Sequence, residues 1–476
     1  MGINRSYDAA LSAVTGRQKA FGFCRTNILT QERELPLELQ DSPEKRLVSS
    51  QEIPSLWRNR DYRLLLSGQA VSSIGTQLSQ FAFPLLVLAL SGSAAWAGIT
   101  SALVAVPYLL LSLPAGALVD RWNRKRVLVF CDIGRALCLA SIPVALLLGH
   151  LTVLQLCLAA LVEGSLYVFF NVAEAAALPR VVCNERQLQT AASQSETTKN
   201  VAYTLGPALG GLLLGLGRAL PFVVDACSYG VSVLSLLFIT REFQEEREEH
   251  PRPLRIEIRE GVTWLWRHQI LRFLAVLAGV GNGLDNAVLL LFLVIGTHQG
   301  ASPWAIGVVY AVAGVGGIAA AFAADWAQRR FSMVTITLWT QWISVLVFPV
   351  YLFEPSLLLL GVITCLLTAA STLQGVTQYG YRLSLIPDEL QGRVNSVFRL
   401  VAFAGPPIFL AGTGLLLQAG GVLVAVLVLW IILVAMTVCA AITLKHQGSG
   451  GPVPVFSVQH EAMEQMPPTI GNDILD

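Results

Sequence analysis

Residues 116–126 read GALVDRWNRKR and residues 321–330 read AFAADWAQRR, and each segment follows a long apolar stretch. In both segments an aspartate, Asp120 or Asp325, is followed by a basic pair at the fourth and fifth positions. Self-similarity at a constant offset is the sequence signature of repeated structural units. The correspondence therefore predicts a chain built from two equivalent halves.

The composition around these segments is that of a membrane protein. Hydrophobic residues make up 54% of the chain and charged residues 13%, whereas an ordinary soluble domain carries about 25% charged residues. A soluble protein of this composition would expose large apolar patches, and a lipid-facing surface removes that problem. The formal net charge is +1, so no global field attracts the chain to nucleic acid.

Apolar stretches extend in both directions from residues 116–126 almost without interruption. A membrane-crossing helix needs about 20 apolar residues, and about twelve stretches of this kind occur. They lie near residues 63–91, 95–119, 127–149, 152–178, 194–216, 220–240, 271–297, 303–325, 333–353, 356–385, 394–417 and 421–444. We therefore predict an all-α integral membrane protein with twelve transmembrane helices arranged as two six-helix bundles.

Lysine and arginine are concentrated in every second connection between the predicted spans. The basic connections lie at 121–126, 180–186, 241–272 and 329–330 and around Arg393, while the other connections hold Arg218 as the lone exception. Positively charged loops remain in the cytoplasm. The sequence thus predicts a multi-pass protein of the cell membrane with both termini in the cytoplasm.

The predicted spans divide into two sets around a charged connection. We expect a disordered cytoplasmic tail over 1–54, six-helix bundles over 55–240 and 271–444, and a cytoplasmic tail over 445–476. The linker over 241–270 begins with a solvated charged run and ends with Trp and Arg residues that predict an interfacial helix.

Several stretches resemble a known family. Residues 116–126 are similar to the signature loop between spans two and three of the major facilitator superfamily, over a region of resemblance from about 55 to 444. The segment GPALGG at 206–211 resembles the span-five motif of drug/proton antiporters, with Ala202 where that motif usually has glycine, and its Gly-Pro pair recurs at 405–406. Four stretches resemble the macrolide and siderophore exporters of bacteria: 58–64, 178–182, 260–268 and 386–396. Members of that branch often carry an acidic residue after the span-one glycine, where Gly75 is followed here by Thr76.

This resemblance implies a monomeric secondary transporter that exports a small hydrophobic or amphipathic solute of the drug, macrolide or siderophore type. It implies coupling to protons by antiport, with alternating access. The sequence contains no Gly-x-x-x-x-Gly-Lys-Ser/Thr loop for a nucleotide, and no cofactor or metal is expected, because the eight cysteines and six histidines are scattered. An importer or uniporter of the same fold and a non-transporting membrane receptor stay open as alternatives; an enzyme is not favoured.

The resemblance also implies a gate. The signature aspartate would pair with the start of span eleven when the inner side is closed, because a helix N-terminus attracts anions. The predicted gate consists of Gly116, Asp120, Arg121, Arg124 and Arg393. The alternative is that these charges only set the topology.

A glycine-rich segment predicts a bend in span five. Gly206, Pro207, Gly210 and Gly211 remove side-chain bulk and one backbone donor, which permits close helix contact and bending. Ordinary tight packing would use the same residues.

Acidic residues inside membrane spans are costly and usually functional. Glu163 lies about mid-depth in span four, Asp285 about mid-depth in span seven, and Asp225 nearer the outer end of span six. A carboxyl group in a low-dielectric cavity can exchange protons near neutral pH, so these three are the candidates for proton coupling, with Glu163 first. Glu174 and Glu196 are expected near the cytoplasmic face in solvated structural roles.

Aromatic and amphipathic residues of the spans are candidates for lining an apolar substrate cavity, although lipid contact or helix packing would explain them too. They are Phe81, Phe83, Tyr108, Tyr167, Phe169, Phe170, Asn171, Gln374 and Tyr379. Few cationic residues are found inside the spans at mid-depth, which argues against a strongly anionic substrate.

Overall fold

The computed structural model describes residues 56–182, 185–240, 243, 254–387 and 390–448. Regular secondary structure within these residues is helical throughout, and they contain no strand. The predicted N-terminal tail, most of the charged run at the start of the linker and the end of the C-terminal tail lie outside the described residues.

The first half begins with the 3-10 helix η3 (Leu56–Arg58) and continues with six long helices. These are α4 (Arg60–Ser91), α5 (Ala94–Val119), α6 (Arg124–Leu147), α7 (Val153–Val181), α8 (Glu185–Leu216) and α9 (Leu220–Phe238). Asn59, Ser93, Asn123 and Thr152 cap four of them, because their side-chain oxygens accept from backbone N–H groups of the first turn. Such caps satisfy donors that a helix start leaves unpaired, and they fix where each helix begins.

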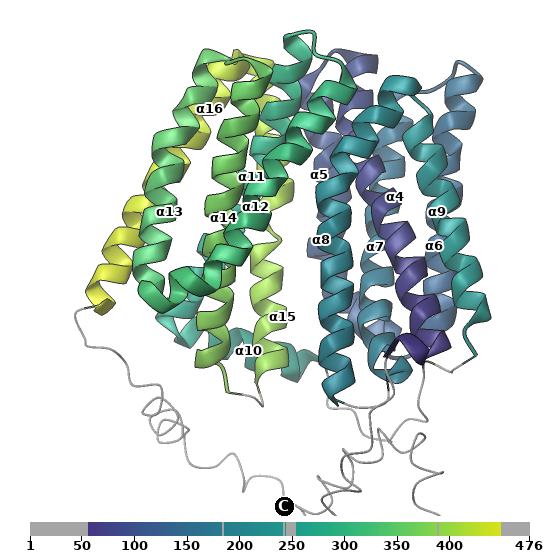
Figure 1. Ribbon diagram of the computed structural model, residues 1–476, viewed down its shortest axis with the longest axis horizontal. Helices are drawn as coiled ribbons and strands as arrows, with labels where there is room; N and C mark the ends of the chain where they lie inside the picture. Colours follow the sequence, from purple (N-terminus) through teal and green to yellow (C-terminus); the bar gives the residue numbers. More distant parts are fainter. Residues whose placement is uncertain (1–55, 183–184, 241–242, 244–253, 388–389, 449–476) are drawn as a thin grey trace, which may run out of the picture.

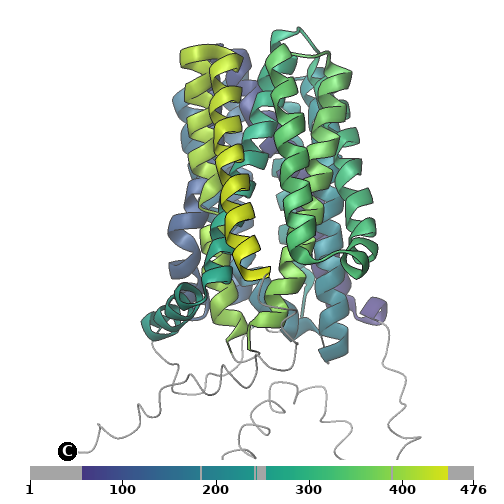
Figure 2. The same ribbon diagram turned by 90° about the vertical axis from the view of Figure 1, so that its left-hand side faces the viewer.

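The second half follows the short helix α10 (Leu254–Arg267). It consists of α11 (Gln269–His298), α12 (Pro303–Arg330), α13 (Met333–Val347) with the 3-10 helix η4 (Phe348–Phe353), α14 (Leu357–Leu385), α15 (Gln391–Ala402) and α16 (Gly405–Gly448). Inside α16, Gly421 has φ 68° and ψ −168°, a conformation that glycine reaches without steric cost. The chain turns back there, and the two limbs of α16 run side by side (Figure 2).

Ten helical segments of the described chain are long and apolar enough to cross a membrane. The last of them, Gln391–Leu444, is 54 residues long and contains the turn at Gly421, so it accounts for two predicted spans. The remaining predicted span is α8, whose 32 residues are ample for a bilayer at about 1.5 Å per residue, although its first half is polar. The expected all-α architecture of membrane helices is therefore confirmed.

The two bundles stand side by side, with α4 to α9 in one and α11 to α16 in the other (Figure 1). The start of α4 and the end of α16 lie at the same end of the molecule, together with the basic loops that follow α5 and α12. We call this end the basic face and the other end the opposite face.

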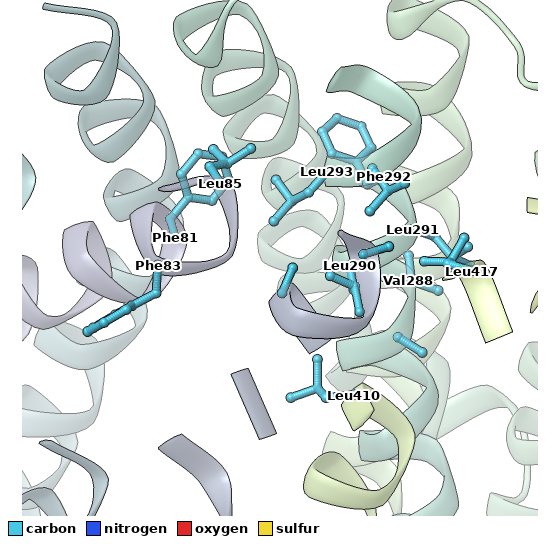
Figure 3. Packing of buried hydrophobic residues seen from close by; sticks show 14 of the residues in the cluster. Phe81, Phe83, Leu85, Val288, Leu290, Leu291, Phe292, Leu293, Leu410 and Leu417 are labelled. Carbon is cyan, nitrogen blue, oxygen red and sulfur yellow. The ribbon is translucent and has the colours of Figure 1, made fainter. Parts of the chain in front are cut away.

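The hydrophobic core is shared by both bundles only near the opposite face. The largest cluster of buried apolar side chains includes residues from Phe81 to Val87 of α4 and from Val288 to Ile295 of α11, with neighbours from α16 (Figure 3). Two smaller clusters each belong to one bundle, around Leu128 in the first and around Leu274 in the second. The halves are therefore packed together near the opposite face and have separate cores near the basic face.

Candidate functional site

A cavity of about 920 Å³ lies between the halves near the basic face. Its walls are the last turns of α5 and α7 and the first half of α8 on one side, and α15 on the other. This volume is within the range of about 300–1,000 Å³ that small-molecule sites occupy. Gly116 and Arg393 of the predicted gate belong to its lining, whereas Asp120, Arg121 and Arg124 do not.

Three of the predicted lining residues face an internal cavity. Tyr108 and Asn171 line the large cavity, and Gln374 lines a smaller pocket in the second half. The Tyr108 hydroxyl accepts a hydrogen bond from Arg399 Nη2 at 2.8 Å, and its ring lies 4.7 Å from that of Phe403. Tyr108 thus links α5 to the second half at the inner end of the cavity.

The other predicted lining residues belong to neither of these two linings and contact aromatic or arginine side chains, with Phe81 paired across the two halves and Tyr379 54% exposed. Tyr167 and Phe170 lie against the Arg135 guanidinium, Phe83 packs on Phe222, Phe169 on Trp122, Phe81 beside Tyr310, and Tyr379 beside Arg382. For these residues helix packing is what the structure shows.

Two expectations about charge are corrected. Arginines do occur within the spans: Arg135 in α6, Arg382 in α14 and Arg399 in α15, of which Arg399 lines the large cavity. The argument against an anionic substrate rested on the scarcity of cationic residues inside the spans, and it does not hold for this cavity, whose lining includes Lys199, Arg393 and Arg399. Glu174, expected in a solvated role, is 7% exposed and pairs with Lys199 Nζ at 3.6 Å, because it lies where α7 meets α4 and α9, beside Gln69 and Ser232.

Arg135 is the centre of a buried polar cluster in the first half. Its side chain is 1% exposed. Nε and Nη2 donate to Glu163 Oε1 at 2.9 and 2.6 Å, and Nη2 also lies 2.5 Å from the Tyr229 hydroxyl and 3.0 Å from Thr76 Oγ1. These side chains come from α6, α7, α9 and α4, so one guanidinium connects four helices.

Two aspartates complete this Arg135 cluster. The Tyr229 hydroxyl has Glu163 Oε1 at 3.0 Å and Asp225 Oδ2 at 3.4 Å as alternative acceptors for its single proton. Asp132 is fully buried and lies 3.9 Å from Arg135 Nη1, which is too far for a hydrogen bond. It adjoins the Ser232 hydroxyl, yet neither carboxylate oxygen has a partner at hydrogen-bond geometry among the described residues.

The charges of the Arg135 cluster do not balance. It contains three carboxyl groups, those of Asp132, Glu163 and Asp225, and one guanidinium. Burying a charge is very costly unless it is paired and hydrogen-bonded. Full ionisation would leave an excess of two negative charges inside the bundle, so charge balance favours bound protons on the carboxyl groups.

The sequence identified this site in part. Glu163 and Asp225 lie together in the Arg135 cluster, whereas Asp285 lies in the other half. Arg135 and Asp132 were missed, although a signal was present: they are three residues apart in a predicted span, and residues at that spacing share a helix face. Burying an arginine inside a membrane span costs about as much free energy as burying an acidic residue, so such an arginine indicates a functional site equally well.

Thr76 follows Gly75 at the position where the exporter-like pattern often has an acidic residue, and it contacts the Arg135 cluster. Its hydroxyl accepts from Arg135, and the acidic partner comes instead from Glu163 of α7. A Cβ at Gly75 would lie 2.5 Å from Asp225 Oδ1 and even closer to the Ser228 hydroxyl. The glycine therefore permits the close approach of α4 to α9 that brings Thr76 to Arg135.

The predicted gate pair is apart in this structure. The Asp120 side chain is 61% exposed and pairs with Arg124 at 3.4 Å across the loop between α5 and α6. No ion pair or hydrogen bond joins Asp120 to α15 in the part of the chain that the structure describes. Arg393 instead pairs with Glu260 of α10 at 2.5 Å. With the basic face open, this separation is what a gate would show, and the gate stays a prediction.

The four exporter-like stretches contact one another in pairs. Glu260 and Arg393 belong to two of them, and Gly261 is so close that a Cβ would lie 2.8 Å from the Arg393 carbonyl oxygen. In the other pair, Asn59 Nδ2 donates to the carbonyl oxygen of Val181 at 2.8 Å. These stretches join helix ends at the basic face.

Glycines bring the two halves together near the opposite face. A Cβ on Gly211 of α8 would collide with a carbonyl oxygen of α12 and lie 3.0 Å from Gly307 Cα. A Cβ on Gly98 of α5 would lie 2.8 Å from Gly414 Cα of α16. We call these the α8–α12 and α5–α16 glycine crossings. They place the halves at backbone contact, which larger residues would prevent.

Two further glycines of the predicted hinge pack within the first half, whereas the Pro207 carbonyl oxygen adjoins Gly307 of α12. A Cβ on Gly206 would collide with Gln77, and one on Gly210 would lie 3.0 Å from the carbonyl oxygen of Leu78; both neighbours belong to α4. Pro207 lies inside α8, which continues through it. Close helix contact is thus present, while a functional bend stays a prediction.

Comparisons with known proteins agree with this architecture. The family model of the Major Facilitator Superfamily matches residues 65–410. The multidrug efflux pump Tap of Mycolicibacterium fortuitum is 29% identical over 372 residues, which cover 75% of this chain and 89% of the relative. Macrolide efflux protein A of Streptococcus pyogenes is 27% identical over 157 residues, or 33% and 38% of the two chains.

Solved structures share the fold at low identity. A bacterial homologue of the human lysosomal transporter Spinster, in its inward-facing and unoccupied conformation, has a TM-score of 0.66 at 15% identity and covers 81% of this chain and 97% of its own. The nucleoside transporter NupG has a TM-score of 0.64 at 11% identity, covering 81% and 98%.

Proposed function

The chain belongs to the major facilitator superfamily, and we propose that it exports a small hydrophobic or amphipathic solute from the cell by proton antiport. In this proposal the protein lies in the cell membrane with its basic face in the cytoplasm. The observation that carries the proposal is the Arg135 cluster, in which three buried carboxyl groups share one guanidinium. The names of the relatives, which are efflux proteins, support the direction of transport.

The Arg135 cluster supplies a physical route for coupling. Hydrogen bonds between charged partners are roughly twice as strong as neutral ones, so a proton on Glu163 weakens its contact with Arg135. Arg135 then finds its counter-charge on Asp132 or Asp225. Because these side chains belong to α6, α7 and α9, a change of partner alters how those helices pack.

The large cavity supports the choice of solute. It mixes apolar side chains such as Leu113 and Val172 with polar ones such as Asn171 and Ser396. The lining also holds five charged side chains, those of Glu174, Glu196, Lys199, Arg393 and Arg399. A site with both apolar and charged groups suits an amphipathic solute better than a purely hydrophobic one. In the proposed cycle the solute enters here from the cytoplasm, the gate closes behind it, and the glycine crossings separate to release it.

The test is proton antiport in inverted membrane vesicles that contain a pH-sensitive dye. We expect dequenching on addition of a compound from a panel of macrolides, other lipophilic drugs and siderophores. Proton-independent equilibration of a solute would favour the uniporter, and net uptake into cells would favour the importer. No change in the distribution of any solute, from protein shown to be inserted, would favour a receptor.

Glu163→Gln should abolish proton-driven export while leaving solute exchange intact. Glutamine has nearly the same shape and can still accept from Arg135, but it cannot take up and release a proton. The measurement compares dye dequenching with counterflow, in which labelled solute exchanges without a proton gradient. Glu354→Gln, an exposed site at the opposite face, is the control, and continued export of solute against its gradient by Glu163→Gln would remove Glu163 from the coupling site.

Asp120→Asn and Glu260→Gln should shift the gate in opposite directions. Asp120→Asn removes the predicted closed-state anion, so export should be lost and the cavity should remain open. Glu260→Gln removes one carboxylate partner of Arg393, so closure should become more frequent. The measurement is the labelling rate of a cysteine at Ser396, on the cavity wall, by an impermeant thiol reagent. Equal rates in both variants would contradict the gate.

A further inference from the structure

A second pocket, of about 110 Å³, lies inside the second half between α11, α13, α14 and α16. Its polar lining comes from Asn282, Asp285, Gln341, Ser344, Ser371, Gln374 and Gln378. The rest of the wall is apolar, with Leu277, Leu284, Val288, Phe348 and Leu433 among its residues. The proton-coupling route proposed above uses none of these side chains.

Asp285 is the acidic group of this pocket and is exposed to it. Ser371 Oγ donates to Asp285 Oδ2 at 2.5 Å, while no ion pair to Asp285 occurs among the described residues. The basic residue of α14, Arg382, is eleven residues beyond Ser371, about 16 Å along the helix, and its guanidinium lies over the Phe398 ring. Asp285 therefore faces the pocket as a carboxyl group that has no cationic partner among the described residues.

Gln378 is a second incomplete group in the same pocket. It is 6% exposed, and its Nε2 has no hydrogen-bond partner among the described residues. The neighbouring amides do have partners, since Gln341 Nε2 donates to Gln374 Oε1 at 3.0 Å. A buried N–H group without an acceptor is costly. The pocket therefore presents a carboxyl group and an amide donor that a ligand with both a positive charge and an acceptor would match.

We propose that this pocket binds the positively charged head group of the exported solute. An aliphatic ammonium group would lie against Asp285, and a nearby hydroxyl or carbonyl oxygen of the solute would accept from Gln378. The inference rests on the proposed export function and narrows its substrates to cationic amphiphiles. It assigns Asp285 to solute binding, in place of the proton coupling that the sequence left open for it.

The pocket's size and walls favour an organic head group over a metal ion. A hard metal cation prefers a shell of oxygen ligands that includes several carboxylates, whereas Asp285 is the one carboxyl group in the lining. The described residues contain no group of three or more His, Cys, Asp or Glu side chains that could hold a metal ion. The pocket is smaller than the roughly 300–1,000 Å³ of a drug-sized site. It therefore holds the charged end of a solute whose apolar body lies outside it.

The test uses two fluorescent probes with the same dansyl group and alkyl linker, one ending in a trimethylammonium group and the other in a hydroxyl group. Binding to the full-length protein in lipid nanodiscs is followed by dansyl fluorescence. We expect tighter binding of the ammonium probe, and Asp285→Asn should weaken it by about ten- to a hundredfold, the loss of one contact to a charged group. The hydroxyl probe should bind as before, which also shows that the variant is folded.

Two further variants complete the test. Asp285→Glu keeps the charge and should keep the preference for the ammonium probe. Asp325→Asn, at an exposed site of α12 paired with Arg329, should change neither affinity. Equal weakening of both probes by Asp285→Asn, unchanged ammonium binding, or loss of the preference in Asp285→Glu would each overturn the inference.

Different results would contradict the head-group pocket and the export function. A wild-type protein without preference for the ammonium probe overturns the inference, while efflux of neutral solutes from cells would still support export. Preference for the ammonium probe in a protein that moves no solute in vesicles would support the pocket and reject export.

Discussion

Arg135→Met is expected to abolish export and to destabilise the protein by about 3–5 kcal/mol, the cost of removing one partner from a buried ion pair. Arg135 is 1% exposed and contacts Glu163, Tyr229 and Thr76. Methionine fills similar space but carries no charge. The carboxyl groups of the Arg135 cluster would then lie inside the bundle without the cation that balances one of them.

Two readouts separate structure from coupling in this experiment. Thermal unfolding in detergent measures stability, and dye dequenching measures transport. Combining Arg135→Met with Glu163→Gln removes both charges, so the double variant should regain much of the lost stability without regaining transport. Arg135→Lys keeps the charge but not the planar fork of donors, and it should be intermediate in stability.

Arg126→Met is the matched control, because Arg126 lies on the same helix but is exposed at the basic face. It should leave unfolding and transport unchanged. If Arg135→Met unfolded at the temperature of the wild-type protein, the Arg135 cluster would not be held together by its charges, and the coupling route through Glu163 would lose its basis.

The arrangement of spans was predictable because the bilayer imposes it. Hydrocarbon thickness sets the length of each apolar stretch, and the repeat of Asp120 at Asp325 reports the equivalence of the halves. α8 illustrates the limit of hydropathy. Its first half is polar because it forms part of the wall of the large cavity, so the apolar signal covers only part of the helix.

The sites were less predictable because they are formed by side chains from several helices. Glu163 and Asp225 are 62 residues apart in the sequence, and only folding shows that both adjoin Tyr229. The pocket at Asp285 joins α11 to α14 in the same way. The pattern of residues along one helix does not predict which side chains of other helices it will meet. The position of Arg135 within a predicted span did, however, indicate a buried charge.

The glycine crossings reveal a second repeat between the two halves, which the sequence pattern alone did not predict. Ser93 and Ser302 each cap a helix, and Gly98 and Gly307 follow them at the fifth position. Each glycine contacts a helix of the other half. The span-five motif identified Gly211, but no motif identified its partner Gly307. A contact between two halves that are distant in sequence produces no local sequence pattern.

Gly211→Ala is expected to disfavour the conformation that is closed at the opposite face. The added Cβ would collide with the Pro303 carbonyl oxygen and lie 3.0 Å from Gly307 Cα. Both obstacles are backbone atoms, so no side chain can rotate away and α8 must separate from α12. Overpacking of this kind costs about 1–3 kcal/mol, which shifts a two-state equilibrium by roughly 5- to 150-fold. Export should fall accordingly, and Gly211→Leu should abolish it without preventing membrane insertion.

The measurement is the distance between spin labels at Leu147 and Phe353, exposed positions at the opposite face in the first and second halves. Labels are attached to cysteines in a background that lacks the native ones. Gly211→Ala should add a population with a longer distance. Gly215→Ala is the matched control one turn further along α8, since a Cβ there would lie 3.7 Å from its nearest neighbour, in ordinary van der Waals contact.

A distance distribution for Gly211→Ala that matched the control would mean that the α8–α12 crossing persists throughout the transport cycle. The crossing would then be a fixed pivot, and closure of the opposite face would depend on the α5–α16 crossing at Gly98 and Gly414.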